Sequence, residues 1–191
     1  MTGIPGVGKT SVLQELEKIA EGGGLKLRIV TFSTVMLNIA EREGKIFERD
    51  GLRRLPIHLQ KELQHKAAVE IGGMAQGDQT FIVDTHMVVR TGAGFWSGLP
   101  QNVLNELRPS LLVLVEADPG EVLQRRVGDT SRSRDRVAFD EIVDEISVAR
   151  SIAASCATLT GAPFKVLVNP AGRKTEVAAE LLKVISEIGR D

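Results

Sequence analysis

The amino-acid sequence predicts an α/β protein in which helices cover both faces of a mainly parallel β-sheet, giving three layers. Four short apolar runs alternate with helical stretches, at residues 25–31, 80–84, 110–115 and 164–168. Such alternation is typical of parallel strands joined by right-handed crossovers. A glycine-rich turn at residues 3–8 also leads directly into a helical pattern. Ligands of such sheets bind beyond the carboxyl ends of the strands, so the residues that follow each strand are the candidates for a site.

The composition indicates a single domain and excludes several classes of protein. The 191 residues carry a net charge of −1, so the chain lacks the basic character of a nucleic-acid-binding protein. The single cysteine, Cys156, excludes an intramolecular disulfide, and its place on an apolar helical stripe predicts a buried structural thiol. No stretch approaches the ~20 apolar residues of a membrane span, and no signal peptide is visible. We therefore expect one soluble, cytoplasmic domain over residues 1–191, without membrane or nucleic-acid partners.

Residues 3–10, Gly-Ile-Pro-Gly-Val-Gly-Lys-Thr, match the phosphate-loop pattern GxxxxGK[ST]. Glycines let backbone N–H groups close around an anion, and the positive end of the following helix adds to the attraction. Lys9 supplies a point charge for the β- and γ-phosphates, and the Thr10 hydroxyl can ligate Mg²⁺. A mere turn before a helix is the alternative. The apolar face of the helix expected at residues 9–21 favours phosphate binding.

The start of the chain departs from this pattern. A phosphate loop normally follows a buried central strand, and only Met1 and Thr2 precede Gly3. The four apolar runs leave the sheet one strand short. We expect that the true start lies several apolar residues upstream of Met1. Without that strand the sheet would have an open central slot, and its two neighbouring strands would lack a partner.

The stretch at about residues 33–76 is longer than a crossover between two strands requires, because it holds two helical patterns. It is expected to form an inserted lobe. Ser33 and Thr34 follow a strand, where they serve either as a helix N-cap or as contacts to a second ligand. The basic residues Arg49, Arg53 and Arg54 are either surface charges or an anion site, and the apolar neighbours of the last two favour the anion site.

An acidic residue, Asp84, ends the apolar run at 80–84. A carboxylate at this position can hold Mg²⁺ through water or orient a substrate group. His86 has no second histidine or cysteine nearby at ligand spacing, so a zinc site is not expected. Residues 90–99, which are rich in glycine, are expected to form a loop at the active edge, with Trp96 covering the site or filling the core.

Five arginines fall within the twelve residues 125–136. A solvated charge run is the usual interpretation, but the helix that begins at Asp118 is too short to cross the sheet. The next helix, at 139–160, spans about 33 Å and can cross it. The arginines therefore stay on the active side and form a short lid at about 128–137, where they can compensate the charge of a phosphoryl transition state. Arg150, off the middle of the long helix's apolar stripe, can also point at the site.

Together these features resemble the archaeal-type adenylate kinases, a phosphate-loop family of nucleoside monophosphate kinases, over essentially the whole chain. The resemblance is carried by residues 3–10, 33–36, Arg49-Asp50 with Arg53, 83–86, 98–100 with 103–107, 132–135 and 159–162. It implies reversible phosphoryl transfer from ATP to AMP, giving two ADP, with Mg²⁺ as cofactor and a role in adenine nucleotide balance. It also implies a cytoplasmic homotrimer, with the lobe at 33–76 binding the nucleoside monophosphate.

The resemblance assigns roles residue by residue. The catalytic set is Lys9, Arg126, Arg132 and Arg134; ATP would be bound by Gly3, Ile4, Pro5, Gly6, Val7, Gly8, Lys9, Thr10 and Ser11; AMP by Thr34, Arg53 and Arg90; and Mg²⁺ by Thr10 and, partly through water, Asp84. Two positions depart from the pattern of longer-lid adenylate kinases. The arginine expected shortly after the Ser-Thr pair is absent, since residues 37–40 are Leu-Asn-Ile-Ala, and Arg90 lies further from Asp84.

Two other functions remain open from the sequence. The chain could be another small phosphate-loop kinase with a different nucleotide or small-molecule acceptor, since AMP rests on resemblance alone. It could also be a nucleotide-binding module without turnover, although the intact Lys9 and the lid arginines argue against this.

Overall fold

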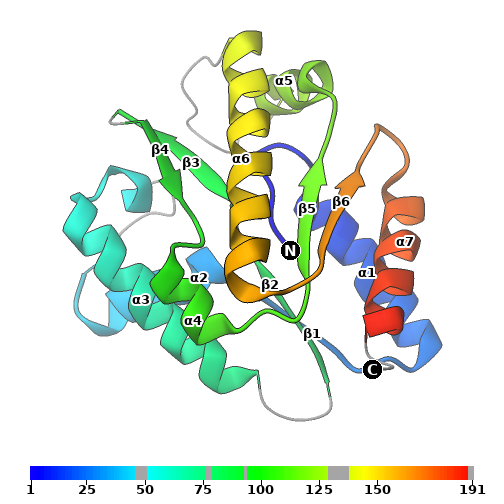
Figure 1. The fold of residues 1–191 in the computed structure, drawn as a ribbon, viewed down its shortest axis with the longest axis horizontal. Coiled ribbons are helices and arrows are strands. Elements are labelled where there is room, and N and C mark those ends of the chain that lie inside the picture. Colours follow the sequence, from blue (N-terminus) through cyan, green and yellow to red (C-terminus); the bar gives the residue numbers. More distant parts are fainter. Residues whose placement is uncertain (46–50, 76–78, 93, 129–137, 189–191) are drawn as a thin grey trace.

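A computed structural model describes residues 1–45, 51–75, 79–92, 94–128 and 138–188, and it confirms the α/β class (Figure 1). Two pairs of parallel strands lie side by side. Strand β1 (Leu27–Thr31) pairs with β2 (Thr80–Asp84), and β5 (Leu112–Glu116) pairs with β6 (Phe164–Val168). These are the four predicted strands, with β1 and β5 each beginning two residues later than predicted.

The first residues of the chain join the two strand pairs. Thr2 forms a parallel bridge with Leu114: its N–H donates to the Val113 carbonyl at 2.7 Å, and its carbonyl accepts from the Val115 N–H at 2.8 Å. On the other side, the Met1 ammonium donates to the Val83 carbonyl at 2.9 Å. The carboxyl-terminal end of the expected central slot is therefore occupied, and the phosphate loop starts from a position held on both sides.

Helices cover both faces of the strands (Figure 1). On one face, α1 (Lys9–Gly23) packs against α7 (Lys174–Ile188). On the other, α6 (Phe139–Thr160) crosses the strands, and α4 (Gln101–Leu107) packs between α6 and α3 (Ile57–Met74). None of the helices in the described part of the chain is long and apolar enough to cross a membrane.

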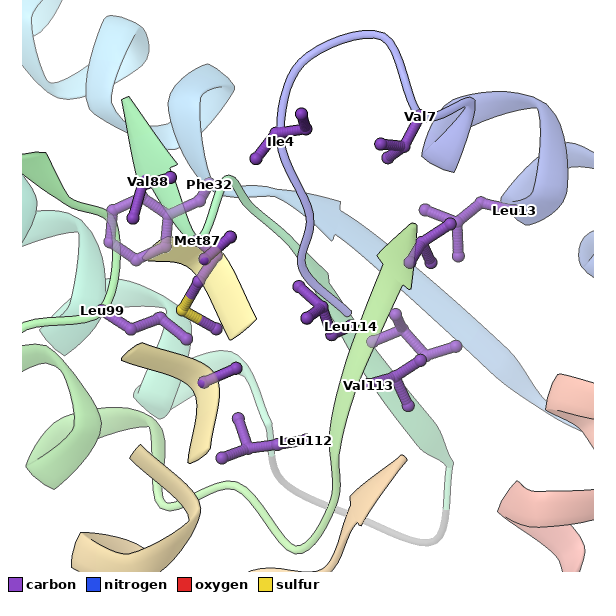
Figure 2. Close-up of a cluster of buried hydrophobic side chains, with 14 of the residues drawn as sticks. Ile4, Val7, Leu13, Phe32, Met87, Val88, Leu99, Leu112, Val113 and Leu114 are labelled. Atoms are coloured by element: carbon purple, nitrogen blue, oxygen red, sulfur yellow. The ribbon is translucent and has the colours of Figure 1, made fainter. Parts of the chain in front are cut away.

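The core reaches directly under the phosphate loop (Figure 2). Ile4 and Val7 of the loop belong to the same buried cluster as Leu13 of α1, Leu114 of β5 and Met87. Because densely packed interiors resist deformation, this packing holds the loop in place.

The inserted lobe consists of α2 (Phe32–Arg42), a short 3₁₀ turn (Gly51–Arg54) and α3. Helix α2 begins at Phe32, so neither Ser33 nor Thr34 is its N-cap, and that prediction was wrong. The helical hydrogen bonds start directly at the strand end, which places both hydroxyl residues inside the first turn.

The predicted loop at residues 90–99 is also wrong, because the chain there forms an antiparallel hairpin. Strand β3 (Val88–Thr91) pairs with β4 (Gly94–Ser97). Gly92 lies at the turn and Gly94 begins β4, while β-branched and aromatic residues occupy most other strand positions, as is typical of hairpins. The Arg90 guanidinium lies 5.0 Å from the centre of the Phe95 ring, its cross-strand partner.

Helix α5 (Pro119–Gly128) starts as predicted. The Asp118 carboxylate accepts hydrogen bonds from the backbone N–H groups of Gly120 at 2.8 Å and Glu121 at 3.2 Å. This N-cap satisfies donors that a helix start otherwise leaves unpaired. Because Arg125 and Arg126 belong to α5, the cap that fixes the start of this helix also fixes the position of these two arginines.

Candidate functional site

The phosphate loop runs from the central slot into α1 in a conformation that requires glycine. Gly6 and Gly8 have φ values of 92° and 86°, in the left-handed region that side chains rarely adopt. A Cβ atom at Gly8 would lie 2.5 Å from the Asn169 amide nitrogen. Helix α1 then begins at Lys9, so the N-terminal end of its dipole adjoins the loop. This is the geometry of an anion-binding turn.

Three side chains that follow the carboxyl ends of β5 and β6 bind the carbonyl groups of the loop. Arg126 donates to the Pro5 carbonyl from Nε at 3.0 Å and Nη2 at 2.8 Å. Asn169 donates to the Val7 carbonyl from Nδ2 at 2.8 Å, and Arg125 does so from Nη1 at 3.3 Å. The conformation of the loop therefore depends on α5 and on the residue that follows β6.

A buried carboxylate, Glu145 of α6, completes this support. It pairs with Arg126 at 2.5 Å (Nη2 to Oε2), and both side chains are about 5% exposed. Its other oxygen lies 3.6 Å from Arg90 Nε, and Arg90 Nη1 lies 3.6 Å from the more exposed Glu141. Burying a charge is costly unless it is paired, so Glu145 and Arg126 depend on each other. Glu145 thus links the phosphate loop to an arginine that the sequence assigns to the acceptor.

A cavity of about 390 Å³ lies between the phosphate loop and the inserted lobe. Its size is within the range of small-molecule sites. Seven residues singled out from the sequence line it: Gly6, Gly8, Lys9, Thr10, Ser11, Ser33 and Asp84. They come from the loop, the start of α2 and the end of β2, as the rule on carboxyl ends of strands predicts.

The charged groups of the cavity suit a nucleotide with a metal ion. The Lys9 ammonium lies 3.1 Å from His86 Nδ1 and 3.4 Å from the Gly3 carbonyl. Asp84 is 8% exposed, and its Oδ1 has no hydrogen-bond partner among the described residues. A buried carboxylate oxygen without a hydrogen-bond partner in the described structure and the Thr10 hydroxyl line the same cavity. Both are suitable ligands for Mg²⁺, which takes few protein ligands and keeps waters and substrate phosphates.

Other residues of the predicted site lie elsewhere in this structure. Thr34 is exposed and does not line the cavity, and Arg90 is directed to Glu141, Glu145 and Phe95. The side chain of Arg53 lies outside the described part of the structure, as do Arg132 and Arg134.

Arg150, which the sequence left as a candidate for the site, pairs with a different group. Its Nε donates to Glu116 Oε1 at 2.9 Å, and this hydrogen bond raises the pKa of Arg150. Cys156 is buried as predicted, and burial raises the pKa of its thiol, so it remains protonated and unreactive.

Trp96, expected either to cover the site or to fill the core, lines the cavity. Several other cavity residues were not assigned to the site from the sequence: Met36, Leu52, Gln60, Gln64 and Arg125. A signal existed for the two glutamines, because Gln60 and Gln64 are four residues apart and share one face of α3. Gln64 is buried, and its Oε1 accepts a hydrogen bond from Trp96 Nε1 at 3.2 Å. Gln64 Nε2 also donates to the Ser97 carbonyl at 3.3 Å, so this amide fixes the position of the hairpin beside the cavity.

The parallel strands, the glycine-rich anion loop and the cavity shared with an inserted lobe define the class of phosphate-loop kinases. A family described as an AAA domain matches residues 2–143. Among solved structures, the shikimate kinases of Acinetobacter baumannii and Bacteroides thetaiotaomicron have TM-scores of 0.61 and 0.59 at 17% and 16% identity. These structures cover 97% of this chain, which covers 90% and 96% of theirs. This likeness concerns the fold.

Sequence relatives specify the family. The adenylate kinase of Sulfurisphaera tokodaii is 40% identical over 185 residues, 95% of either chain. That of Methanopyrus kandleri is 41% identical over 188 residues, covering 98% of this chain and 96% of its own, and that of Methanocaldococcus jannaschii is 39% identical over 185 residues, covering 97% and 96%. The chain belongs to the archaeal adenylate kinases, and it is therefore an enzyme of the nucleoside monophosphate phosphotransferase type.

Proposed function

We propose that this enzyme transfers a phosphoryl group reversibly between ATP and AMP, giving two ADP, and so maintains the balance of adenine nucleotides. The observation that supports this most directly is the cavity, because the phosphate loop and the inserted lobe line the same space. A donor and an acceptor held there need no nucleophile from the protein, so positioning and charge neutralisation supply the catalysis.

In this proposal residues 3–11 bind ATP, and the Lys9 ammonium lies on the transferred phosphoryl group. Ser33, Gln60 and Gln64 line the acceptor side of the cavity, and Thr34, Arg53 and Arg90 are proposed to complete the AMP site. Arg90 must then exchange its contacts with Glu141 and Glu145 for the AMP phosphate.

The lid arginines Arg132 and Arg134 are proposed to neutralise the transition state, with Arg126 acting beside them. The Arg126 guanidinium donates hydrogen bonds to the Pro5 carbonyl and to Glu145. In this proposal Arg126 therefore supports catalysis by positioning the phosphate loop.

Mg²⁺ is proposed to bind between Thr10 and Asp84, where it would neutralise phosphate charge. Replacing Asp84→Asn should raise the Mg²⁺ concentration for half-maximal activity by about ten-fold or more, because the amide lacks the negative charge. A Mg²⁺ titration of initial rates, with Mg²⁺-dependent ATP binding by calorimetry as a second readout, measures this. Asp118→Asn is the matched control, since Asp118 caps α5 outside the cavity. Equal Mg²⁺ dependence in both variants would argue against the metal assignment.

The acceptor is tested by turnover with a panel containing AMP, CMP, UMP and shikimate, each with ATP and Mg²⁺. We expect the largest kcat/KM with AMP. A preference for another acceptor would favour a different small phosphate-loop kinase, and ATP binding without turnover on any acceptor would favour a nucleotide-binding module.

A cytoplasmic location and a homotrimeric state are also proposed, on the family resemblance. Light scattering of the purified enzyme tests the trimer, for which a mass of three chains of 20.7 kDa is expected.

A further inference from the structure

His86 is a cavity residue to which the proposed mechanism assigns no role. It follows the carboxyl end of β2, two residues after Asp84, and it lines the cavity together with Lys9. Its Nδ1 atom lies 3.1 Å from the Lys9 ammonium nitrogen, which is within hydrogen-bond distance. No second histidine or cysteine lies near it in the sequence at ligand spacing, so zinc does not explain its presence. The contact with Lys9 requires a different explanation.

This contact fixes which nitrogen of the imidazole carries the hydrogen. An ammonium group only donates hydrogen bonds, so Nδ1 must present its lone pair to Lys9. A neutral imidazole has its single hydrogen on the other nitrogen, which here is Nε2. Nδ1 also lies 3.3 Å from the Gly3 carbonyl oxygen, but without a hydrogen it cannot donate to that oxygen. The Gly3 carbonyl instead accepts from Lys9 Nζ at 3.4 Å.

The backbone around His86 is held against the phosphate loop. The N–H of the next residue, Met87, donates to the Gly3 carbonyl at 3.3 Å, and the Met87 side chain is buried in the cluster beneath the loop (Figure 2). On the other side, the Gly98 N–H donates to the Met87 carbonyl at 2.9 Å. A Cβ atom at position 98 would lie 1.7 Å from the His86 carbonyl oxygen, so this close approach requires glycine. Backbone contacts on two sides therefore place the imidazole.

A neutral acceptor suits Lys9 better than a carboxylate would. The Lys9 residue is 6% exposed, and a buried ammonium requires hydrogen-bond partners. Its flexible stem also needs a partner if the ammonium is to keep one position. A carboxylate would meet both needs, but its negative charge would oppose the positive charge that stabilises a phosphoryl transition state. A neutral imidazole orients the ammonium and leaves its charge in place.

We propose that His86 positions Lys9 for phosphoryl transfer. The neutral imidazole, with its hydrogen on Nε2, accepts a hydrogen bond from the ammonium at Nδ1 and directs it to the phosphates without reducing its charge. Because His86 acts through Lys9, it is a positioning residue. The inference rests on the proposed phosphoryl transfer in this cavity, but the contact itself can also be measured in the enzyme without turnover.

The first test compares three substitutions of His86 by initial rates with ATP, AMP and Mg²⁺. His86→Leu removes the acceptor, and we expect kcat to fall by on the order of 10²-fold, the usual result of misplacing a group at a reacting centre. KM for ATP should change less, since the backbone N–H groups of the phosphate loop remain. His86→Asn places its Oδ1 near the position of Nδ1 and should restore most of kcat. His86→Gln places its acceptor one bond further out and should not.

The matched control is His65→Leu, because His65 is an exposed histidine of α3 that does not line the cavity. It should turn over at the rate of the original enzyme. The proposal is overturned if His86→Leu is as fast as His65→Leu, or if His86→Asn is as slow as His86→Leu. If the original enzyme transfers no phosphoryl group to AMP, the proposed function fails instead, and the second test decides whether the contact exists.

The second test is NMR of isotope-labelled histidine rings, above the pH at which an ordinary histidine titrates. The signals of His86 are assigned by their loss in His86→Asn. We expect the hydrogen on Nε2 in the original enzyme. In Lys9→Ala the Nδ1 atom, 3.3 Å from the Gly3 carbonyl oxygen, is released to donate, so the hydrogen should move to Nδ1. A hydrogen on Nδ1 in the original enzyme, or the same tautomer in both proteins, would overturn the proposal.

Discussion

Replacing Lys9→Ala should lower kcat by about 10²–10³-fold, as expected when a preorganised charge at a transition state is removed. The Lys9 side chain is buried at the start of α1, and its ammonium lies in the cavity beside His86. No other lysine lines that cavity, so within the described residues nothing of the same kind can replace its charge. Initial rates with ATP, AMP and Mg²⁺ measure the effect, together with circular dichroism to establish that the fold is retained.

The control for this variant is Lys18→Ala on the same helix. Lys18 is 69% exposed and pairs with Glu15 on the surface, so its loss should leave kcat and KM unchanged. If Lys9→Ala turns over as fast as Lys18→Ala, the phosphate loop is not the site of transfer, and the assignment of the cavity is wrong.

Replacing Glu145→Ala should destabilise the enzyme by about 3–5 kcal/mol, the usual cost of removing one partner of a buried ion pair. Arg126 would keep its charge in a buried position, with the Pro5 carbonyl as its remaining hydrogen-bond partner among the described residues. Urea unfolding measures the loss of stability. We also expect a higher KM for ATP, because the Arg126 side chain holds the loop that binds the phosphates.

Two further variants make this prediction specific. Glu141→Ala removes a more exposed carboxylate that lies 3.6 Å from Arg90, and it should cost less than about 1 kcal/mol. The double variant Arg126→Met with Glu145→Leu should recover much of the stability, because apolar residues of similar volume often replace a buried pair without loss. Its activity should stay low, since the hydrogen bonds to Pro5 are gone. Equal stability losses for Glu145→Ala and Glu141→Ala would contradict the assignment.

The local features of this protein were predictable because their signals lie within a few residues of each other. The phosphate loop at residues 3–10, the cap at Asp118 and the long helix Phe139–Thr160 each follow from contiguous patterns of glycine, capping and apolar residues. The hairpin of β3 and β4 carries a local signal too, because β-branched and aromatic residues flank its turn, but the glycines of residues 90–99 are equally typical of a loop.

The partners of the arginines were not predictable in the same way. The sequence places Arg90, Arg126 and Arg150 near the active edge, but which carboxylate each one meets depends on how α6 crosses the strands. Glu145 reaches Arg126 and Arg90, while Glu116 takes Arg150. Glu145 has no local signal, because an acidic residue on a long helix is usually solvated, and only its burial against α5 reveals its role.

The sequence by itself determined that this protein has a phosphate loop, parallel strands of an α/β fold and an inserted lobe, and that it resembles the archaeal adenylate kinases. Those properties depend on residue types at short spacing, which backbone geometry and helix periodicity constrain directly. Only the tertiary structure decided that Met1 and Thr2 bridge β2 and β5, and that Gln64 lines the cavity and accepts a hydrogen bond from Trp96. Contacts between distant segments depend on how layers pack, and packing is a property of the whole chain.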